Sequence, residues 1–249
     1  MPSRLKVAVF IKSRIKDNIT RNWPAIMSAR AKKASDPRLK HFYQAYKHPC
    51  KTPLNKLSFT AVDFETTGLN PEQDEIVSIG LIPFDLKTIY SSRAAHWLVK
   101  PAGDLDQESI VIHGITHSDI HKAPDLLTLL ERLLQILAGK IIVVHYHRIE
   151  RDFLNKALKD RLGEGIQFPV IDTMAIESTL EYKRAGRFWK RLAGHKPGSV
   201  RLAASRERYG LPAYPPHNAL TDALATAELF QAQVAHHFSP GTYLGRVLV

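Results

Sequence analysis

The chain has 249 residues, of which 44% are hydrophobic and 24% charged, and its formal net charge is +11. This composition is that of a folded globular protein and excludes a disordered, fibrous or disulfide-rich chain. The single cysteine excludes an internal disulfide and favours a reducing compartment such as the cytoplasm. No apolar run reaches the roughly 20 residues of a membrane-spanning helix, so no membrane partner is expected.

The excess positive charge lies at the start of the chain. Residues 1–56 contain 14 Lys and Arg but only 2 Asp and Glu, whereas residues 57–249 contain 21 Lys and Arg against 22 Asp and Glu. Apolar residues early in the chain recur with helical spacing until Asp36-Pro37 interrupts them. We predict a basic, helical N-terminal arm and linker over 1–56. It binds a polyanion such as nucleic acid, docks a polymerase or another protein, closes over the rest of the chain, or is solvated and has no partner.

The rest of the chain, residues 57–249, is predicted to form an α/β domain with a mixed sheet flanked by helices. Three strand patterns come first and form an antiparallel meander, and alternating helices and strands follow. The predicted strands are 57–64, 75–83, 88–99, 141–144 and 170–171. The predicted helices are 124–137, 149–162, 199–208 and 218–237.

The first acidic motif lies on the first predicted strand. Side chains two residues apart on a strand point to the same face, so Asp63 and Glu65 lie side by side among apolar residues. Two like charges so placed raise each other's pKa unless a cation lies between them. A divalent metal such as Mg²⁺ typically binds carboxylate oxygens of this kind. The alternative is a strand end that carries two solvated acids.

A second motif precedes the last predicted helix. Pro215 and Pro216 interrupt the chain there, and Asn218 is a good N-cap. His217 therefore lies just outside the helix and Asp222 in its first turn, so that both can face one pocket. Asp222 has no Lys or Arg three or four residues away, and a metal would serve as its partner. Alternatively, it is an ordinary first-turn acid favoured by the helix dipole.

A third motif opens the helix predicted at 149–162. Glu150 and Asp152 lie about 200° apart on a helix, so only one of them can face the core. Two apolar residues, Phe153 and Leu154, lie on the side of Glu150. The spacing therefore favours Glu150 as the inward acid and leaves Asp152 to solvent.

Taken in chain order, the three motifs resemble those of the DEDDh class of 3′-to-5′ exonucleases, in the RNase H-like superfamily. This class includes the proofreading subunit of bacterial DNA polymerase III and ribonuclease T. Residues 62–69 and 217–223 match the first and last family motifs. Weaker features lie at 112–116 and 171–173. The resemblance implies an RNase H-like exonuclease domain over 57–249.

The motif that opens the helix predicted at 149–162, which is the middle one in chain order, departs from the family pattern. The family has His-Asn-Ala-x-Phe-Asp, whereas this chain reads His145-Tyr-His-Arg-Ile-Glu150. Glu150 takes the position of the family's aspartate, and Asp152 is the alternative fourth acid. Tyr146 replaces an asparagine that helps to order the site in the family, which leaves the substrate contacts there open.

The resemblance covers about residues 57–238 and implies a metal-dependent 3′-to-5′ exonuclease that releases nucleoside monophosphates from single-stranded DNA. His217 would be the general base that accepts a proton from the attacking water. Two Mg²⁺ or Mn²⁺ ions would be held by Asp63, Glu65, Asp222 and Glu150. The substrate would contact Thr66, Thr67, Leu69, His145 and Phe153.

Other hypotheses stay open. An exoribonuclease or a hydrolase of short oligonucleotides would differ by a few contacts with the 2′ position of the sugar. A nucleic-acid-binding module with impaired catalysis would follow from the altered middle motif. The basic, aromatic stretch 183–191 either binds a single strand or packs on the core. A homodimer and a role in DNA replication or repair are also compatible with the resemblance.

Overall fold

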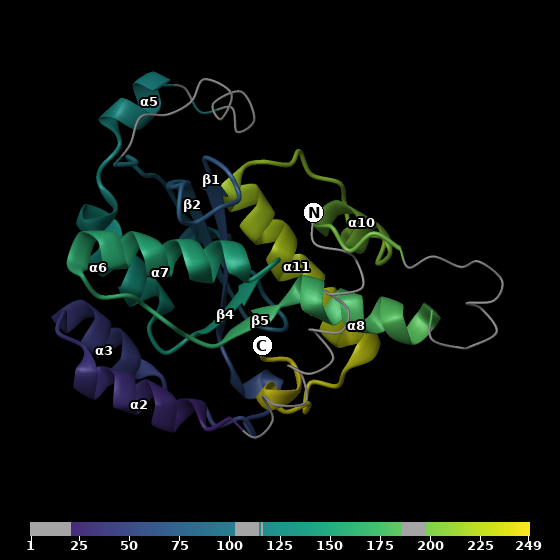
Figure 1. Ribbon diagram of the computed structural model, residues 1–249. Helices are drawn as coiled ribbons and strands as arrows, with labels where there is room; N and C mark the ends of the chain where they lie inside the picture. Colours follow the sequence, from purple (N-terminus) through teal and green to yellow (C-terminus); the bar gives the residue numbers. More distant parts are fainter. Residues whose placement is uncertain (1–20, 103–114, 116, 186–197) are drawn as a thin grey trace.

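The structure, a computed structural model, describes residues 21–102, 115, 117–185 and 198–249. Its centre is a mixed β-sheet (Figure 1) with the strand order β3-β2-β1-β4-β5. β1 pairs antiparallel with β2, and β2 with β3, whereas β1, β4 and β5 run parallel. This confirms the predicted meander followed by parallel strands. The strands are β1 Phe59–Thr66, β2 Ile76–Phe84, β3 Ala95–Leu98, β4 Ile141–Val144 and β5 Val170–Asp172.

Helices cover both faces of the sheet (Figure 1), with α6 and α7 on one side and α11 on the other. Both faces are therefore buried, which explains why β4 is apolar at every position. The helices are α2 Trp23–Lys33, α3 Pro37–Ala45, α5 His117–Lys122, α6 Leu126–Leu137, α7 Arg148–Leu162, α8 Thr173–Ala185, α10 Leu202–Glu207 and α11 Ala219–His237. Short 3₁₀ turns lie at Leu54–Lys56, Ser91–Arg93 and Leu244–Arg246. None of the helices in the described ranges has the length and apolar character needed to cross a bilayer.

Two predictions about the elements were wrong. The strand predicted at 88–99 begins only at Ala95, because residues 91–93 form a 3₁₀ turn whose backbone hydrogen bonds replace those of a strand. Helix α8 was not predicted. It starts directly after β5, where Asp172 accepts a hydrogen bond from the backbone N–H of Ala175 (3.1 Å) and so acts as its N-cap.

The described part of the basic arm packs on the domain. α2 ends at Lys33, and Asp36 caps α3 by accepting from Arg38 N at 2.8 Å, so the chain does break at the predicted position. Trp23 and Phe42 are buried in the same core as the sheet, and the Phe42 ring contacts Phe168 edge to face at 6.0 Å. The division of the chain at residue 56 stays a prediction.

Some features predicted from the sequence lie outside the described residues. These are the beginning of the arm at 1–20, most of the 112–116 feature and the larger part of the 183–191 stretch.

Candidate active site

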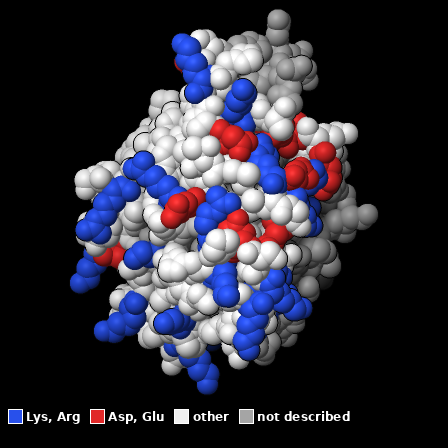
Figure 2. Space-filling model, turned by 90° about the vertical axis from the view of Figure 1, so that its left-hand side faces the viewer, with Lys and Arg blue, Asp and Glu red and all other residues white. Residues whose placement is uncertain are grey.

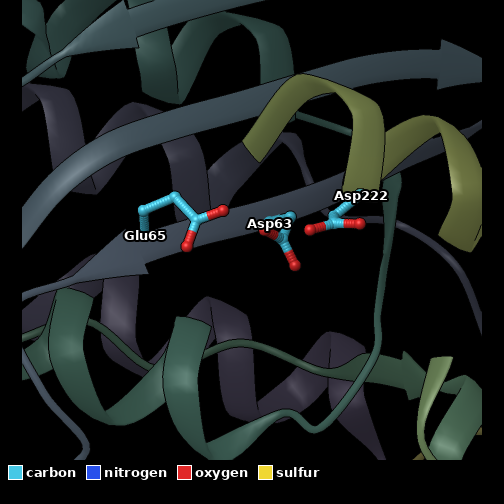
Figure 3. A group of neighbouring side chains, drawn as sticks. All are labelled: Asp63, Glu65 and Asp222. Atoms are coloured by element: carbon cyan, nitrogen blue, oxygen red, sulfur yellow. The ribbon is translucent and has the colours of Figure 1, made fainter. Parts of the chain in front are cut away.

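Three carboxylates converge where the C-terminal half of β1 meets the first turn of α11 (Figure 3). Asp63 and Glu65 lie on β1 and Asp222 on α11, and each offers an oxygen within 4.8 Å of those of the other two. Asp63 lies between its two neighbours, as Figure 3 shows. We call these residues the three-acid cluster. Two segments more than 150 residues apart in the chain thus bring their acids together.

A glycine allows the helix to approach the strand so closely. Gly80 on β2 pairs directly with Asp63 on β1. A Cβ atom at Gly80 would overlap the backbone of Ala219 and Leu220, so the start of α11 lies directly against this glycine. Asn218 caps the helix by accepting from Thr221 N at 3.0 Å, which places Asp222 in the first turn.

The three-acid cluster carries an electrostatic cost. Burial raises the pKa of Asp63 well above its ordinary value, and the charges of Glu150, Asp222 and Glu65 raise it further. Burial and the charge of Glu65 also raise the pKa of Asp222, against the opposing hydrogen bond from His217. A cation between the carboxylates would offset this repulsion. The donor set consists of hard oxygen atoms, so it fits a divalent metal ion.

A fourth acid, Glu150 on α7, lies close enough for its charge to raise the pKa of Asp63. Its side chain is 2% exposed, and its Oε2 atom has no hydrogen-bond partner within the described part of the chain. Burial raises the pKa of Glu150, as does the charge of Asp172. The competing candidate, Asp152, is exposed to solvent. The geometry therefore favours Glu150 as the fourth acid, although it lies outside the three-acid cluster.

Asp172 fixes the turn that leads to Glu150. Its carboxylate accepts hydrogen bonds from Tyr146 N (3.2 Å), from His147 N (3.0 Å) and from His147 Nδ1 (2.7 Å). Burial opposes ionisation of Asp172, but the hydrogen bonds and charge of His147 keep its pKa below the ordinary value. Tyr146 has a φ of +87°, a conformation that costs energy for a residue with a side chain. The sequence indicated Asp172 only as part of a weak motif.

His217 lies beside the cluster on the loop before α11. Its backbone N–H donates to Asp222 Oδ2 at 2.9 Å, and its side chain is exposed. Its φ of +70° is again in the left-handed region that non-glycine residues rarely adopt. The hydrogen bond to Asp222 thus holds the loop in a strained conformation next to the acids, as expected for a functional loop.

The residues after Glu65 form a tight turn with one exposed apolar tip. Thr66 Oγ1 donates to the carbonyl of Gly68 (2.6 Å), and Thr67 Oγ1 donates to Asp74 Oδ1 (3.2 Å). Leu69 is 83% exposed, the highest value among the large hydrophobic residues of the described ranges. Both threonine hydroxyls therefore hold the turn, and Leu69 is available to a ligand.

Of the two remaining predicted substrate contacts, Phe153 is buried and His145 is half-buried. Phe153 is only 2% exposed. His145 uses both ring nitrogens, Nδ1 with Thr173 Oγ1 (2.8 Å) and Nε2 with the carbonyl of Val200 (3.1 Å). Burial lowers the pKa of His145 to about 4, so its ring is neutral at pH 7. These contacts support the site from within.

The same site identifies the family. The model of the Exonuclease family matches residues 60–230 and so includes Asp63, Glu65, Glu150, His217 and Asp222. The chain belongs to the Exonuclease family. The fold of this family is shared by the solved nuclease domain of a DEDDh family member, described in the next paragraph.

Individual relatives agree with this assignment. The chain is 32% identical over 173 residues to the PolC-type DNA polymerase III of Thermotoga petrophila, a match over 70% of this chain but only 12% of the polymerase. It is 29% identical over 181 residues to the DNA polymerase III subunit epsilon of Treponema pallidum, over 73% of this chain and 78% of that subunit. The nuclease domain of 3′hExo, a DEDDh family member bound to rAMP, shares the fold. Its TM-score is 0.57 at 18% identity, over 75% of this chain and 94% of that domain.

Proposed function

We propose that this protein is a metal-dependent 3′-to-5′ exonuclease that releases nucleoside monophosphates from single-stranded DNA ends by two-metal-ion hydrolysis. The observation that carries the proposal is the three-acid cluster, with carboxylate oxygens within 4.8 Å of one another. Four acids alone would repel a phosphodiester, so the site needs cations before it can accept its substrate.

The residues of the site have different roles in the proposed hydrolysis. Asp63, Glu65 and Asp222 would hold the ions directly, and Glu150 would contribute its buried Oε2 atom. Bound Mg²⁺ or Mn²⁺ supplies the positive charge that offsets the carboxylates and stabilises the charge on the phosphate. His217 accepts the proton of the attacking water, because an imidazole can take up a proton near neutral pH.

The end of the strand would bind beside the turn after β1. Leu69 is exposed there and would contact the terminal base, a type of contact that does not distinguish one base from another. Thr66 and Thr67 would bind the end of the strand through their backbone, whose conformation their side-chain hydroxyls fix. His145 and Phe153 would support the site as positioning residues and would not touch the substrate.

DNA is the preferred substrate in this proposal because the relatives described above are a PolC-type DNA polymerase III and an epsilon subunit of DNA polymerase III. The rAMP bound to 3′hExo supports the second candidate, an exoribonuclease or a hydrolase of short oligonucleotides. A polymerase partner, a homodimer, a role in replication or repair and a cytoplasmic location stay predictions.

A 5′-labelled strand tests the proposal. The full chain would be incubated with single-stranded DNA or RNA of the same sequence, in Mg²⁺, Mn²⁺ or EDTA. We expect a ladder that shortens from the 3′ end and disappears in EDTA, in Asp63→Asn and, at least in large part, in Glu150→Gln. The matched variant Asp152→Asn should keep its activity.

Other outcomes of this assay would contradict parts of the proposal. Faster shortening of RNA than of DNA would favour the second candidate. No shortening of either strand by the folded protein in either metal would contradict hydrolysis altogether and favour a binding module. Loss of activity in Asp152→Asn but not in Glu150→Gln would reassign the fourth acid.

A further inference from the structure

An open groove lies between α2 and α3, away from the three-acid cluster. Its volume is about 620 Å³, and it is lined by the side chains of three lysines, Lys32, Lys40 and Lys47. Ser28 and Gln44 add polar groups to the same walls. We call it the lysine groove. No acidic side chain of the described residues lines it.

The charge of the lysine groove is uncompensated. Lys32, Lys40 and Lys47 are exposed, and none of them forms an ion pair with an acid of the described residues. Residues 21–56 contain nine Lys and Arg but one acid, Asp36, and that acid pairs with Arg38 at 2.6 Å. Figure 2 shows Lys and Arg side chains, without Asp or Glu, over the lower part of the face, at the level of α2 and α3.

The groove and the cluster lie at opposite ends of the central strands. His48, just after α3, contacts the carbonyl of Gly139 at 2.9 Å, and Gly139 lies two residues before β4. The start of β4 pairs with the start of β1, Ile141 with Phe59, whereas Glu65 lies near the far end of β1. Six residues of strand separate the two positions, which corresponds to about 20 Å. The groove is therefore a separate surface.

We propose that the lysine groove is a second nucleic-acid-binding site, which takes the phosphodiester backbone of a strand some distance from the end being hydrolysed. Lysine ammonium groups bind phosphates as point charges and release counterions, without reading the sequence. Nucleic acid is favoured over an acidic protein segment because it carries one charge per nucleotide and is the substrate class of the active site. In this respect the inference rests on the proposed function.

The test compares two triple variants of the full chain that have equal net charge. Lys32→Gln, Lys40→Gln and Lys47→Gln together remove the groove's charge, and a matched control combines Lys87→Gln, Lys122→Gln and Lys159→Gln. These control lysines are exposed and lie outside the groove. Binding of a fluorescent single strand of about 30 nucleotides is measured in EDTA over a range of salt concentrations. Hydrolysis of a dinucleotide is measured in Mg²⁺, because a substrate with a single phosphodiester bond can occupy the active site but cannot reach the groove.

The groove variant should bind the long strand at least about 10-fold more weakly at low salt. Its logarithmic salt slope should be shallower by about 2, since each phosphate contact on a single strand contributes about 0.7. The control should keep wild-type binding, and both should hydrolyse the dinucleotide at the wild-type rate. Failure of the wild type to hydrolyse would contradict the proposed function but leave the binding result intact.

Three results would overturn the inference. Unchanged binding of the long strand by the groove variant would show that the groove does not hold nucleic acid. Equal losses of binding affinity in both triple variants would mean that the strand responds to the net positive charge of the protein and not to a specific site. Wild-type binding of polyglutamate that is as tight as DNA binding, and is lost in the groove variant, would identify an acidic protein segment as the occupant.

Discussion

Asp63 lies where burial and three neighbouring acids all oppose its ionisation. It is half-buried on β1, next to Glu65 and Asp222, and the charge of Glu150 also acts on it. Its pKa is therefore raised in the folded protein, so its ionisation destabilises the metal-free protein. Sites that bind metal ions through several carboxylates carry such a cost until the ions are bound.

Replacing Asp63 by asparagine should stabilise the metal-free protein while abolishing hydrolysis. Because its folded pKa lies above the unfolded value, the contribution of Asp63 is most favourable below about pH 4 and is lost as the pH rises. The excess stability of Asp63→Asn should thus grow from pH 4 to pH 7. A gain of about 1 kcal/mol would appear as about 2–4 °C in the melting temperature.

Thermal melts in EDTA and in Mn²⁺ check this prediction. In Mn²⁺ the order should reverse, because the wild type gains stability from binding the ion and the variant loses that gain. Asp160→Asn, at an exposed position on α7, is the control and should show no such reversal. If Asp63→Asn were less stable than the wild type in EDTA at pH 7, this would contradict the inference that ionised Asp63 destabilises the metal-free protein.

His217 combines an exposed imidazole with a left-handed backbone. Asparagine tolerates that conformation but cannot act as a base at neutral pH. His217→Asn should therefore lower kcat by about 10²–10⁴-fold. Mn²⁺ binding should stay unchanged. His121→Asn, at an exposed position on α5, is the control, and a His217→Asn variant that keeps the wild-type kcat would exclude His217 as the base.

At the scale of elements, the contact between β2 and α11 decides whether the acids meet. Gly80 leaves room for the backbone of Ala219, so the helix start reaches the strand pair that carries Asp63. The turn before α7 is fixed in a comparable way by Asp172, which also caps α8. Backbone contacts of this kind, in addition to the acids themselves, determine the geometry of the site.

Gly80→Ala should displace the start of α11 and separate Asp222 from Asp63. We expect a loss of about 1–3 kcal/mol in the free energy of unfolding, as for other overpacked positions. Hydrolysis and Mn²⁺ affinity should fall together. Gly241→Ala is the control, because the added Cβ would meet only Ser239 Oγ at 3.9 Å. Full activity of Gly80→Ala would show that the contact does not position the site.

At the scale of the whole molecule, α2 and α3 share a core with the sheet. Phe42 is 3% exposed and packs on Phe168, which precedes β5. The basic arm predicted from the sequence thus contains a packed helical pair in its described part. This pair carries both the apolar contacts with the domain and the lysine groove.

Phe42→Ala should therefore destabilise the whole domain by about 3–5 kcal/mol, as for other buried aromatic residues. Denaturant unfolding should show one transition at a lower midpoint, monitored by both circular dichroism and tryptophan fluorescence. The exposed residue Leu69 provides a control, since Leu69→Ala should change stability by less than about 0.5 kcal/mol. An early, separate transition in Phe42→Ala would mean that α2 and α3 unfold independently.

The sequence predicted the sheet well because strand patterns depend on local spacing, and the same spacing underlies the predicted roles of the acids. Alternation on a strand placed Asp63 beside Glu65, and helical spacing selected Glu150 over Asp152. Helix α8 and the role of Asp172 were not predicted, because the turn that Asp172 holds lies 25 residues earlier in the chain. The spacing of residues also did not predict how deeply each side chain is buried. Phe153 and His145 were expected at the substrate, whereas Phe153 is buried and His145 is half-buried with both ring nitrogens hydrogen-bonded.

The central claim is that Asp63, Glu65, Asp222 and Glu150 hold the divalent ions that hydrolysis requires. Anomalous diffraction from crystals of the full chain grown with Mn²⁺ tests it most directly. The account predicts two manganese peaks, both bounded by the three-acid cluster, with Glu150 Oε2 facing one of them directly or through water. Peaks elsewhere, or none at this cluster at saturating Mn²⁺, would contradict it.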